Sequence, residues 1–431
     1  MGGGLMQLVA YGAQDIYLTG NPQITFFKVV YRRHTNFSME AIQQTFNGTF
    51  GTGSSSVTST ISRNGDLVSD LWLDIGLDRA VLAATGTYAN WTNNTGHAFV
   101  KDCEIEIGGQ RIDRHYAQWL DVWNELTDHD ESEWIGLNKH AAKNAYLKSG
   151  SAVATAAGDE VTRVYVPLQF WFCRNPGLAL PLIALQYHEV KLKLTTRAIG
   201  ALVNTDGTTV LPTTPPTCEL WADYIYLDTD ERRRFAQVSH EYLIEQVQRE
   251  TGTMTTSQKL NFNHPVKELI WTVQATTAAV EGIADSGNDA TLNIPTAAGS
   301  AFKNSDYFNY SPGSSGANEI INGQSSEEGF TDLKLQLNGH DRFAKRNASY
   351  FRTCQAIQAG HKVPSKHVYC YSFALKPEEH QPSGTCNFSR IDNAKMVFTG
   401  GDTTNTTLTV WAVNYNVLRI MSGMGGLAYS N

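Results

Sequence analysis

LWADYIYLD at residues 220–228 is echoed by VWAVNYNVL at residues 410–418. Each stretch begins with an apolar residue followed by Trp and Ala. Each then keeps Trp, Ile or Tyr, and Leu or Val on one side of a two-residue period. That alternation predicts a β-strand. One strand that occurs twice, 190 positions apart (411 − 221), raises the question of whether a larger unit is duplicated.

Other segments recur in the same order in the two halves of the chain. The pairs are Glu40, Ile42 and Gln43 with Glu245, Val247 and Gln248; Asn64 and Trp72 with Asn263 and Trp271; Cys103, Ile105, Ile107 and Gly109 with Leu333, Leu335, Leu337 and Gly339; Val164 and Tyr165 with Val368 and Tyr369; and Lys191, Leu192, Leu194 and Thr195 with Lys395, Met396, Phe398 and Thr399. An ordered series with a period of this length predicts a duplicated domain.

The spacing between paired segments changes where loops differ in length. It rises from 199 (271 − 72) to 230 (333 − 103), so the second half gains residues between Trp271 and Leu333. This stretch is rich in Gly, Ser, Asn and Ala, and we expect residues 275–325 to form outward-facing loops that carry any glycans. The first half is longer between Gly109 and Val164, where apolar spacing predicts a helix over 134–147.

Turn signals favour an all-β fold in both halves. CEIEIGGQR and LKLQLNGHDR place Gly-Gly and Asn-Gly between alternating segments, which is the pattern of β-hairpins. Many short strands in a domain of ~200 residues predict a β-sandwich or a jelly roll, and the pattern does not separate the two.

Composition limits the classes of function. The formal net charge of −8 argues against an electrostatic grip on nucleic acid, so no direct nucleic-acid contact is expected. We interpret the short runs Arg32–Arg33 and Arg232–Arg234 as salt-bridged or interface positions. There is neither an apolar run of membrane-spanning length nor a signal-peptide pattern, and the six cysteines are expected to be reduced.

Three clusters could carry chemistry, and each has a plainer interpretation. Cys354, His361, His367 and Cys370 are all of zinc-ligand type, but their spacing fits no established zinc finger and Cys370 lies in an alternating strand. DHDESE at 128–133 could hold a hard cation, yet it also suits the start of the helix predicted after it. GMGGLA at 423–428 has no helix after it to make a phosphate loop.

Catalytic motifs and cofactor-binding motifs are missing from the sequence, so we expect neither an enzyme nor a cofactor or metal. Asn-x-Ser/Thr sequons are numerous, as expected by chance in a Ser/Thr-rich chain. Four of them lie in turn-rich stretches and are the candidate glycosylation sites: Asn90, Asn93, Asn309 and Asn405.

Several long stretches resemble one known family. They are YGAQDIYLTGNPQITFFKVVYRRHTNF (11–37), LALPLIALQYHEVKL (178–192), DYIYLDTDERRRFAQ (223–237), NFNHP (261–265), PSGTCNFSRIDNA (382–394) and NYNVLRIMSGMGGLAYSN (414–431). They look like the major capsid protein of large icosahedral double-stranded DNA viruses, closest to the algal, chlorella-virus-like (phycodnavirus) members. The resemblance runs almost end to end and fades near 80–100 and 275–325.

This resemblance implies an all-β chain of two tandem eight-stranded antiparallel jelly rolls with short helices in loops. It also implies a homotrimeric, pseudo-hexagonal capsomer that tiles an icosahedral shell around an internal membrane and the genome. Expected partners are copies of the chain, neighbouring capsomers, minor capsid proteins and the membrane beneath the shell, with possible glycans outside. The protein would be made and assembled in the host cytoplasm and reside in the virion.

The expected organisation is an N-terminal arm (1–26), a first jelly roll (27–227) and a second jelly roll (228–431). We expect the arm to be extended and pinned against partner subunits, because it is Gly-rich and precedes the first duplicated segment. A jelly-roll carbohydrate-binding surface protein is the alternative of a different class. A lectin would gather aromatic or carboxamide groups in one cleft, whereas a shell protein buries long flanks against its copies.

Overall fold

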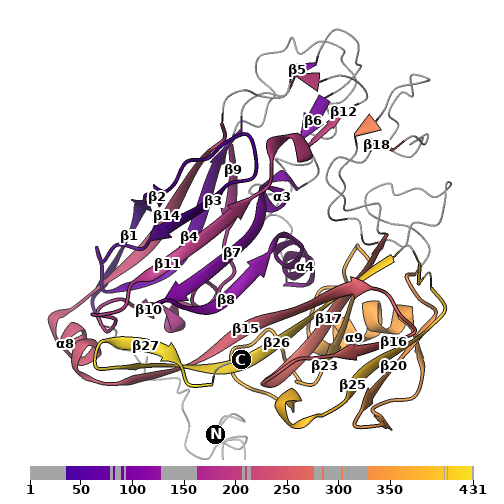
Figure 1. Ribbon diagram of the computed structural model, residues 1–431. Coiled ribbons are helices and arrows are strands. Elements are labelled where there is room, and N and C mark those ends of the chain that lie inside the picture. The colour runs from indigo at the N-terminus through magenta and orange to yellow at the C-terminus, as the bar shows by residue number, and fades with distance from the viewer. Residues whose placement is uncertain are drawn as a thin grey trace, which may run out of the picture. The chain divides into compact units, whose positions relative to one another are not determined.

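Two pairs of antiparallel sheets, one pair from each half of the chain, make up the computed structural model (Figure 1). The structure describes residues 35–77, 81–82, 89–91, 94–127, 163–205, 209–210, 215–275, 284–285, 302–303, 308, 310, 328–401, 403–404 and 406–429. Residues 38–431 belong to a single unit that contains both pairs of sheets. The predicted arm at 1–26 and the predicted helix at 134–147 lie outside the described residues.

The first pair of sheets uses residues from Phe37 to Leu227. One sheet has the order β1–β14–β4, with β9 and β10 also paired to β4, and the other has the order β2–β3–β11–β7–β8. The bounds are β1 Phe37–Gln44, β2 Phe46–Asn47, β3 Ser56–Thr60, β4 Leu67–Gly76, β7 Val100–Ile107, β8 Gln110–Tyr116, β9 Arg163–Pro167, β10 Leu180–Pro181, β11 Val190–Thr196 and β14 Thr217–Leu227.

The second pair repeats this order. One sheet runs β15–β26–β17–β23, with β24 and β27 attached, and the other runs β16–β25–β20–β21, with β22 attached. The bounds are β15 His240–Thr253, β16 Ser257–Leu260, β17 Pro265–Ala275, β20 Asp332–Leu337, β21 His340–Asp341, β22 Arg346–Asn347, β23 Val368–Ser372, β24 Cys386–Asn387, β25 Ala394–Thr399, β26 Thr406–Met421 and β27 Met424–Leu427. Two sheets of four principal strands in each half confirm the predicted double jelly roll.

Strand register confirms the duplication residue by residue. In the first half Cys103 lies opposite Leu194, and Ile105 lies opposite Leu192. In the second half their sequence counterparts pair in the same register, Leu333 with Phe398 and Leu335 with Met396. All eight side chains are buried in the sandwich cores. Because a one-residue slip would turn every side chain to the opposite face, this register is set by the alternating apolar pattern.

Both predicted hairpin turns are present. Gly108 and Gly109 have φ angles of 58° and 85°, and Asn338 and Gly339 have φ angles of 49° and 83°. Two consecutive positive φ values are the geometry of the two-residue turn that matches strand twist, which only Gly and Asn adopt readily. Ile107 pairs with Gln110, and Leu337 pairs with His340, across these turns.

The two Trp-Ala strands, β14 and β26, differ in their surroundings. On β14 the side chains in the sandwich core are Leu220, Ala222 and Tyr224, so Trp221 lies on the outer face of its sheet and is partly exposed. Trp411 occupies the matching outer face of β26 but is fully buried. The shared pattern therefore identifies a common outer face, which is covered in one half only.

Short helices occupy the connections between strands. They include α3 (Thr95–Phe99), α4 (Ala117–Thr127), α7 (Trp171–Arg174), α8 (Thr229–Gln237), a π-helical turn (Tyr350–Cys354) and α9 (Gln355–Ala359). Helix α4 follows β8, and the π-helical turn with α9 follows β22, so they hold equivalent places in the two jelly rolls. Within the described segments, every helix is too short or too polar to cross a lipid bilayer.

Loops from both halves form a small sheet at one end of the strands. Its order is β18–β19–β12–β6, with bounds Ala284–Asp285, Phe302–Lys303, Val203–Thr205 and Ala89–Trp91. The chain leaves β4 at Gly76 to enter β6, whereas α8 lies at the start of β4, where Arg232 pairs with Asp66. The small sheet and α8 therefore lie at opposite ends of β4. Within 275–325, where we expected loops throughout, β18 and β19 are short strands.

Candidate functional site

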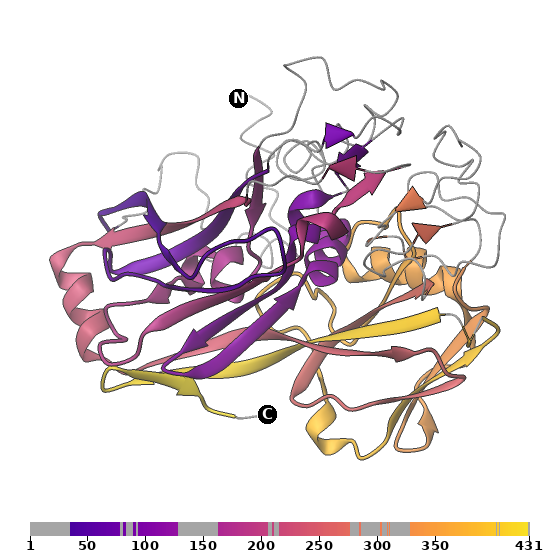
Figure 2. The same ribbon diagram turned by 45° about the horizontal axis from the view of Figure 1, so that its top comes forward.

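The junction between the two jelly rolls centres on tryptophans of helix α4. Trp119 stacks on Trp123 with ring centroids 5.4 Å apart, and it meets Trp411 of β26 at 6.2 Å. Figures 1 and 2 show α4 next to the long strand β26. Helix α4 is not among the elements predicted from the sequence, although Trp119, Val122, Trp123 and Leu126 recur at helical spacing and are buried.

One apolar core continues from the first jelly roll onto the outer face of the second. Ile270, Trp411 and Val413 belong to the same buried cluster as Leu71 and Leu73 of the first half. The inner face of the same sheet packs elsewhere, in the core of the second jelly roll. The sheet of β17 and β26 is therefore buried on both faces.

Hydrogen bonds between β15 and β8 also connect the two jelly rolls at this junction. The Gln246 side chain of β15 donates to the carbonyl of Ile112 in β8, and the Val247 N–H donates to the Asp113 carboxylate at 3.1 Å. Asp113 also pairs with buried His115 at 2.8 Å. These polar partners come from both jelly rolls and fix the register of β8 against β15.

Acidic side chains of α4 receive donors from the second half. The Lys366 ammonium lies 2.7 Å and 2.8 Å from the two Asp121 oxygens, and the Tyr310 hydroxyl donates to the same carboxylate at 2.9 Å. The Ser365 N–H donates to Glu125 at 2.7 Å. Helix α4 is thus tied to the second jelly roll by apolar and ionic contacts together.

A buried ion cluster surrounds Glu245 of β15. Its carboxylate lies 3.0 Å from Arg174 of the first half and 2.8 Å from Lys267 of β17, with His380 at 3.9 Å. Burial opposes ionisation of Glu245, but the attraction of Arg174 and the bonds from His380 and Lys267 lower its pKa to about 2. Burial lowers the pKa of Lys267, and the attraction of Glu245 acts against that effect.

His361 joins two carboxylates beside this cluster. One ring nitrogen lies 2.8 Å from Glu268, and the other lies 2.7 Å from Glu378. Burial disfavours the imidazolium, yet the charges and hydrogen bonds of both carboxylates outweigh it and raise the pKa of His361 to about 9. His361 is therefore a charged link between β17 and the loop that follows β23.

The structure separates the four residues of zinc-ligand type. His361 is engaged by carboxylates, the Cys370 thiol donates to the Phe351 carbonyl at 3.6 Å, and Cys354 is exposed. In the described part of the chain, no three His, Cys, Asp or Glu side chains converge as metal ligands would. All six cysteines lie in described segments and are free thiols.

The candidate glycosylation sites are only partly placed. Asn90 lies on β6, opposite Asn204 of β12, in the small sheet of loops. Asn93, Asn309 and Asn405 fall outside the described residues. Arg232 is salt-bridged as expected, to Asp66 at 3.0 Å.

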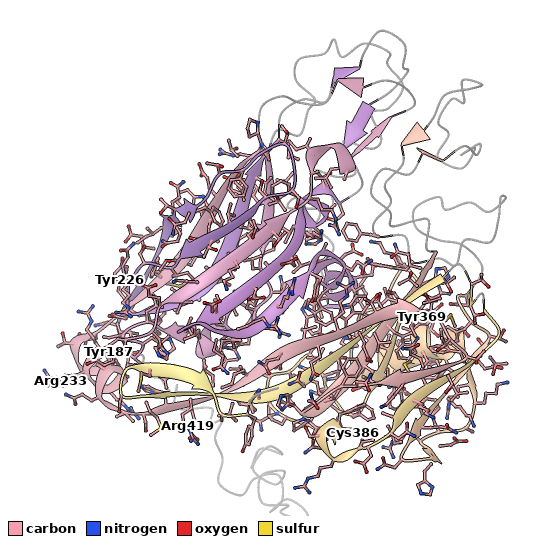
Figure 3. All side chains as sticks on the ribbon, in the orientation of Figure 1. Tyr187, Tyr226, Arg233, Tyr369, Cys386 and Arg419 are labelled. Atoms are coloured by element: carbon pink, nitrogen blue, oxygen red, sulfur yellow. The ribbon has the colours of Figure 1, made fainter. Side chains whose placement is uncertain are left out.

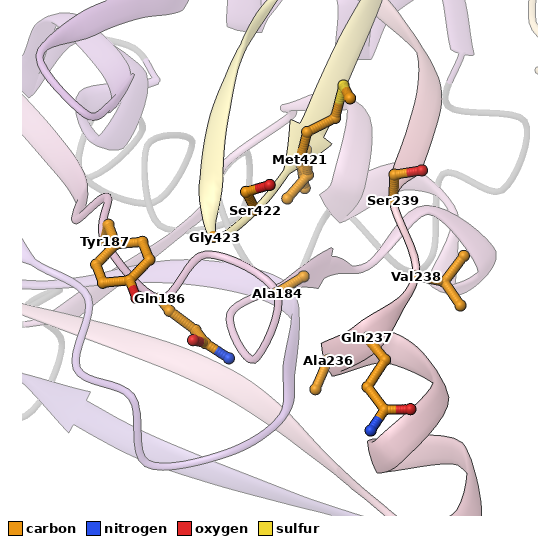
Figure 4. A pocket seen from close by; sticks show the side chains of 11 residues that line it. Ala184, Gln186, Tyr187, Ala236, Gln237, Val238, Ser239, Met421, Ser422 and Gly423 are labelled. Carbon is orange, nitrogen blue, oxygen red and sulfur yellow. The ribbon is translucent and has the colours of Figure 1, made fainter.

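A surface hollow of about 500 Å³ lies at the end of the strands that carries α8. Figure 4 shows its walls, which come from residues 184–187, the end of α8 and the turn between β26 and β27. Tyr187, Val238 and Met421 on its rim are exposed. Tyr187, Arg233 and Arg419 are labelled at this end in Figure 3. The lining of the hollow combines exposed apolar side chains with uncharged polar ones such as Gln186, Gln237 and Ser239.

Comparison with known proteins agrees with this architecture. Residues 25–228 match a family described as the N-terminus of major capsid proteins, and residues 231–426 match the large eukaryotic DNA virus major capsid protein family. The chain is 49% identical to the major capsid protein of Pyramimonas orientalis virus and 45% identical to that of Paramecium bursaria Chlorella virus 1, in both cases over the whole of each chain.

Solved structures show the same likeness. A chain of the quasi-atomic model of the PBCV-1 virus capsid superposes with a TM-score of 0.72 at 37% identity, covering 94% of this chain and 100% of that one. The Faustovirus major capsid protein superposes with a TM-score of 0.65 at 15% identity, covering 95% of this chain and 94% of that one, and shares the fold.

Proposed function

Because the chain belongs to the major capsid protein family of large eukaryotic DNA viruses, we propose that three copies close into a homotrimeric, pseudo-hexagonal capsomer. The chain is a structural component of the virion capsid. Three chains with two jelly rolls each supply six similar units, and closed cyclic symmetry prevents open-ended growth. These capsomers tile an icosahedral shell around an internal membrane and a double-stranded DNA genome.

The observation that carries the trimer is an asymmetry between the two halves. The outer face of the β17–β26 sheet is covered by the first jelly roll of the same chain, and Trp411 there is fully buried. The equivalent face of the β4–β14 sheet leaves Trp72 and Trp221 partly exposed. A ring in which the halves alternate covers both faces, with more than ~2,000 Å² buried at each permanent contact.

Native mass spectrometry of the purified full chain tests this proposal. A three-chain species is expected under conditions that preserve the particle. Stable species of two or four chains without a three-chain species would overturn the trimer. Electron microscopy separates the shell function from the carbohydrate-binding alternative, because a lectin would give lone small oligomers that never assemble into shells.

The strand ends suggest which side of the capsomer faces outward. We place the small sheet of loops and residues 275–325 outside, where Asn90 and any glycans would meet the host. The end with α8 and the hollow then faces inward, and its exposed Val238, Met421 and Arg233 suit contacts with minor capsid proteins or the internal membrane. Deletion of residues 286–301 should leave trimers intact, and loss of folding would contradict this placement.

We also propose that the chain divides into an arm (1–26), a first jelly roll (27–227) and a second jelly roll (228–431). The helix α8 begins directly after Asp228, whose carboxylate accepts from the Thr229 N–H as an N-cap.

The arm is expected to be pinned against partner subunits. Limited proteolysis should remove it more slowly from assembled capsomers than from dissociated chains, and equal rates would refute the pinning. We further propose that the chain is synthesised and assembled in the host cytoplasm.

A further inference from the structure

The loop at residues 361–367, which we name the bridging loop, leads from α9 to β23 and binds helix α4 of the first jelly roll. Its Lys362 N–H donates to the Leu126 carbonyl at 2.9 Å, and its Ser365 N–H donates to the Glu125 carboxylate at 2.7 Å. A lysine–aspartate pair with α4 is a third contact. The two backbone amides therefore report directly on whether the loop is attached to α4.

The bridging loop begins and ends with histidines in opposite surroundings. At its start, both ring nitrogens of His361 are engaged by carboxylates, and the pKa of about 9 keeps that ring charged at neutral and acidic pH. At its end, His367 is 1% exposed. Within the described part of the chain, neither ring nitrogen of His367 has a hydrogen-bond partner. The loop thus holds one charged imidazole with acceptors and one buried imidazole without them.

The groups around His367 have no acceptor to spare for a protonated ring. Its Nε2 atom lies 3.9 Å from Glu328, whose two oxygens are taken by Arg352 at 2.9 Å and by the Tyr369 hydroxyl at 2.7 Å. Figure 3 labels Tyr369. An imidazolium has two N–H donors, and a buried donor without an acceptor is costly. Burial lowers the pKa of His367; the charge of Glu328 opposes this effect, and that of Arg352 adds to it.

Other ionisable groups meet the bridging loop from neighbouring elements. On α4 these are Asp121 and Glu125, and the Tyr310 hydroxyl donates to the same Asp121 carboxylate as the loop lysine. His97 of α3 reaches Asp121 through the Asn94 side chain. A substitution of His367 leaves all of these groups in place, so it isolates the contribution of that one ring.

We propose that the bridging loop is an acid-sensitive latch, in which protonation of His367 releases residues 361–367 from α4 and loosens the junction between the two jelly rolls. An opened loop exposes the ring to water, where its pKa returns to the ordinary 6.5. Below that pH the opened form binds more protons than the closed form, so acid favours opening. The loop is fully closed above about pH 6.5, and its stability falls as the pH drops further. His361 remains charged throughout this range.

Hydrogen–deuterium exchange of the purified full chain, measured by mass spectrometry at about pH 7.5 and about pH 5, tests the latch. The reporters are the Lys362 and Ser365 amides, with each rate divided by the intrinsic exchange rate at that pH. Their protection should fall about tenfold at the lower pH in the wild type. The amides of β20 in the same jelly roll should keep their protection, which separates opening of the loop from global unfolding.

Three variants assign the effect to one ring. His367→Leu removes the titrating group without breaking a hydrogen bond, so the acid-dependent loss of protection should disappear. His340→Leu is the matched control, because His340 is exposed, and it should behave as the wild type does. Arg352→Met removes a like charge and frees one Glu328 oxygen to accept from the imidazolium, so the loss should become smaller than in the wild type.

Two results would overturn the latch. One is a wild type whose loop amides keep their protection at about pH 5. The other is a His367→Leu chain that loses protection as the wild type does, which would assign the loosening to the carboxylates of α4 or to His97. If His367→Leu does not fold at about pH 7.5, Arg352→Met decides, because an acid-dependent loss equal to that of the wild type would contradict the role of His367.

Discussion

Trp119 of α4 and Trp411 of β26 lie 6.2 Å apart between ring centroids, although 292 positions (411 − 119) separate them in the chain. Each is buried, and each comes from a different jelly roll. Their contact is part of the buried core that the two jelly rolls share.

Replacing Trp411 with Ala should destabilise the protein by about 3–5 kcal/mol, because a fully buried aromatic side chain leaves a cavity that both jelly rolls line. Thermal unfolding by calorimetry measures the loss. Tyr187→Ala is the control, since Tyr187 is exposed on the rim of the hollow and should change stability by less than about 0.5 kcal/mol. Equal effects of the two substitutions would contradict the junction.

Lys267→Met should cost about 3–5 kcal/mol of stability, because Glu245 and Glu268 would lose a cation in a buried site. The double variant Lys267→Met with Glu245→Gln should recover part of that loss, since it also removes the buried negative charge of Glu245. Denaturant unfolding of the single and double variants gives the coupling between the two groups. Strictly additive effects would show that the pair does not interact.

Stability should fall as the pH rises from about 7 through 9, owing to His361. Its folded pKa of about 9 exceeds the usual value of 6.5 for the unfolded chain, so the protonated ring stabilises the fold fully below pH 6.5. That contribution is lost as the pH passes the folded pKa. Melting temperatures of the wild type and His361→Gln between pH 6 and 10 should converge at high pH. The exposed His340→Gln control should run parallel to the wild type.

Gly108→Ala should destabilise more than Gly109→Ala, although both residues have positive φ. Any L residue pays about 1–2 kcal/mol for this left-handed backbone. At Gly108 a Cβ atom would also come within 2.3 Å of the His188 ring, while at Gly109 it would meet open space. His188 in turn bonds Gly425 at 2.8 Å, so the C-terminal hairpin should loosen too. Comparable melting temperatures for the two variants would count against this.

Much of the fold could be predicted from the sequence, because turns and strands depend on residues close together in the chain. The Gly108–Gly109 and Asn338–Gly339 turns and the alternation of Ile105 and Leu335 depend on residues adjacent in sequence, and the structure confirms them. Helix α4 could also have been predicted, because its apolar residues recur at helical spacing. The ion cluster of Glu245 could not have been foreseen, because Arg174 and Lys267 come from segments that no spacing rule connects.

Matched alternation and turn residues recur in order along the chain, and they predict a duplicated all-β protein without any tertiary information. The capsid family is indicated by the resemblance of longer stretches such as 11–37 and 223–237. Which copy of each face is buried becomes apparent only in the folded chain. Trp221 and Trp411 occupy equivalent strands, as do Met39 and Ile244, yet one member of each pair is fully buried and the other is not. Burial depends on what packs against a face, and that packing comes from segments distant in the sequence rather than from the strand's own pattern.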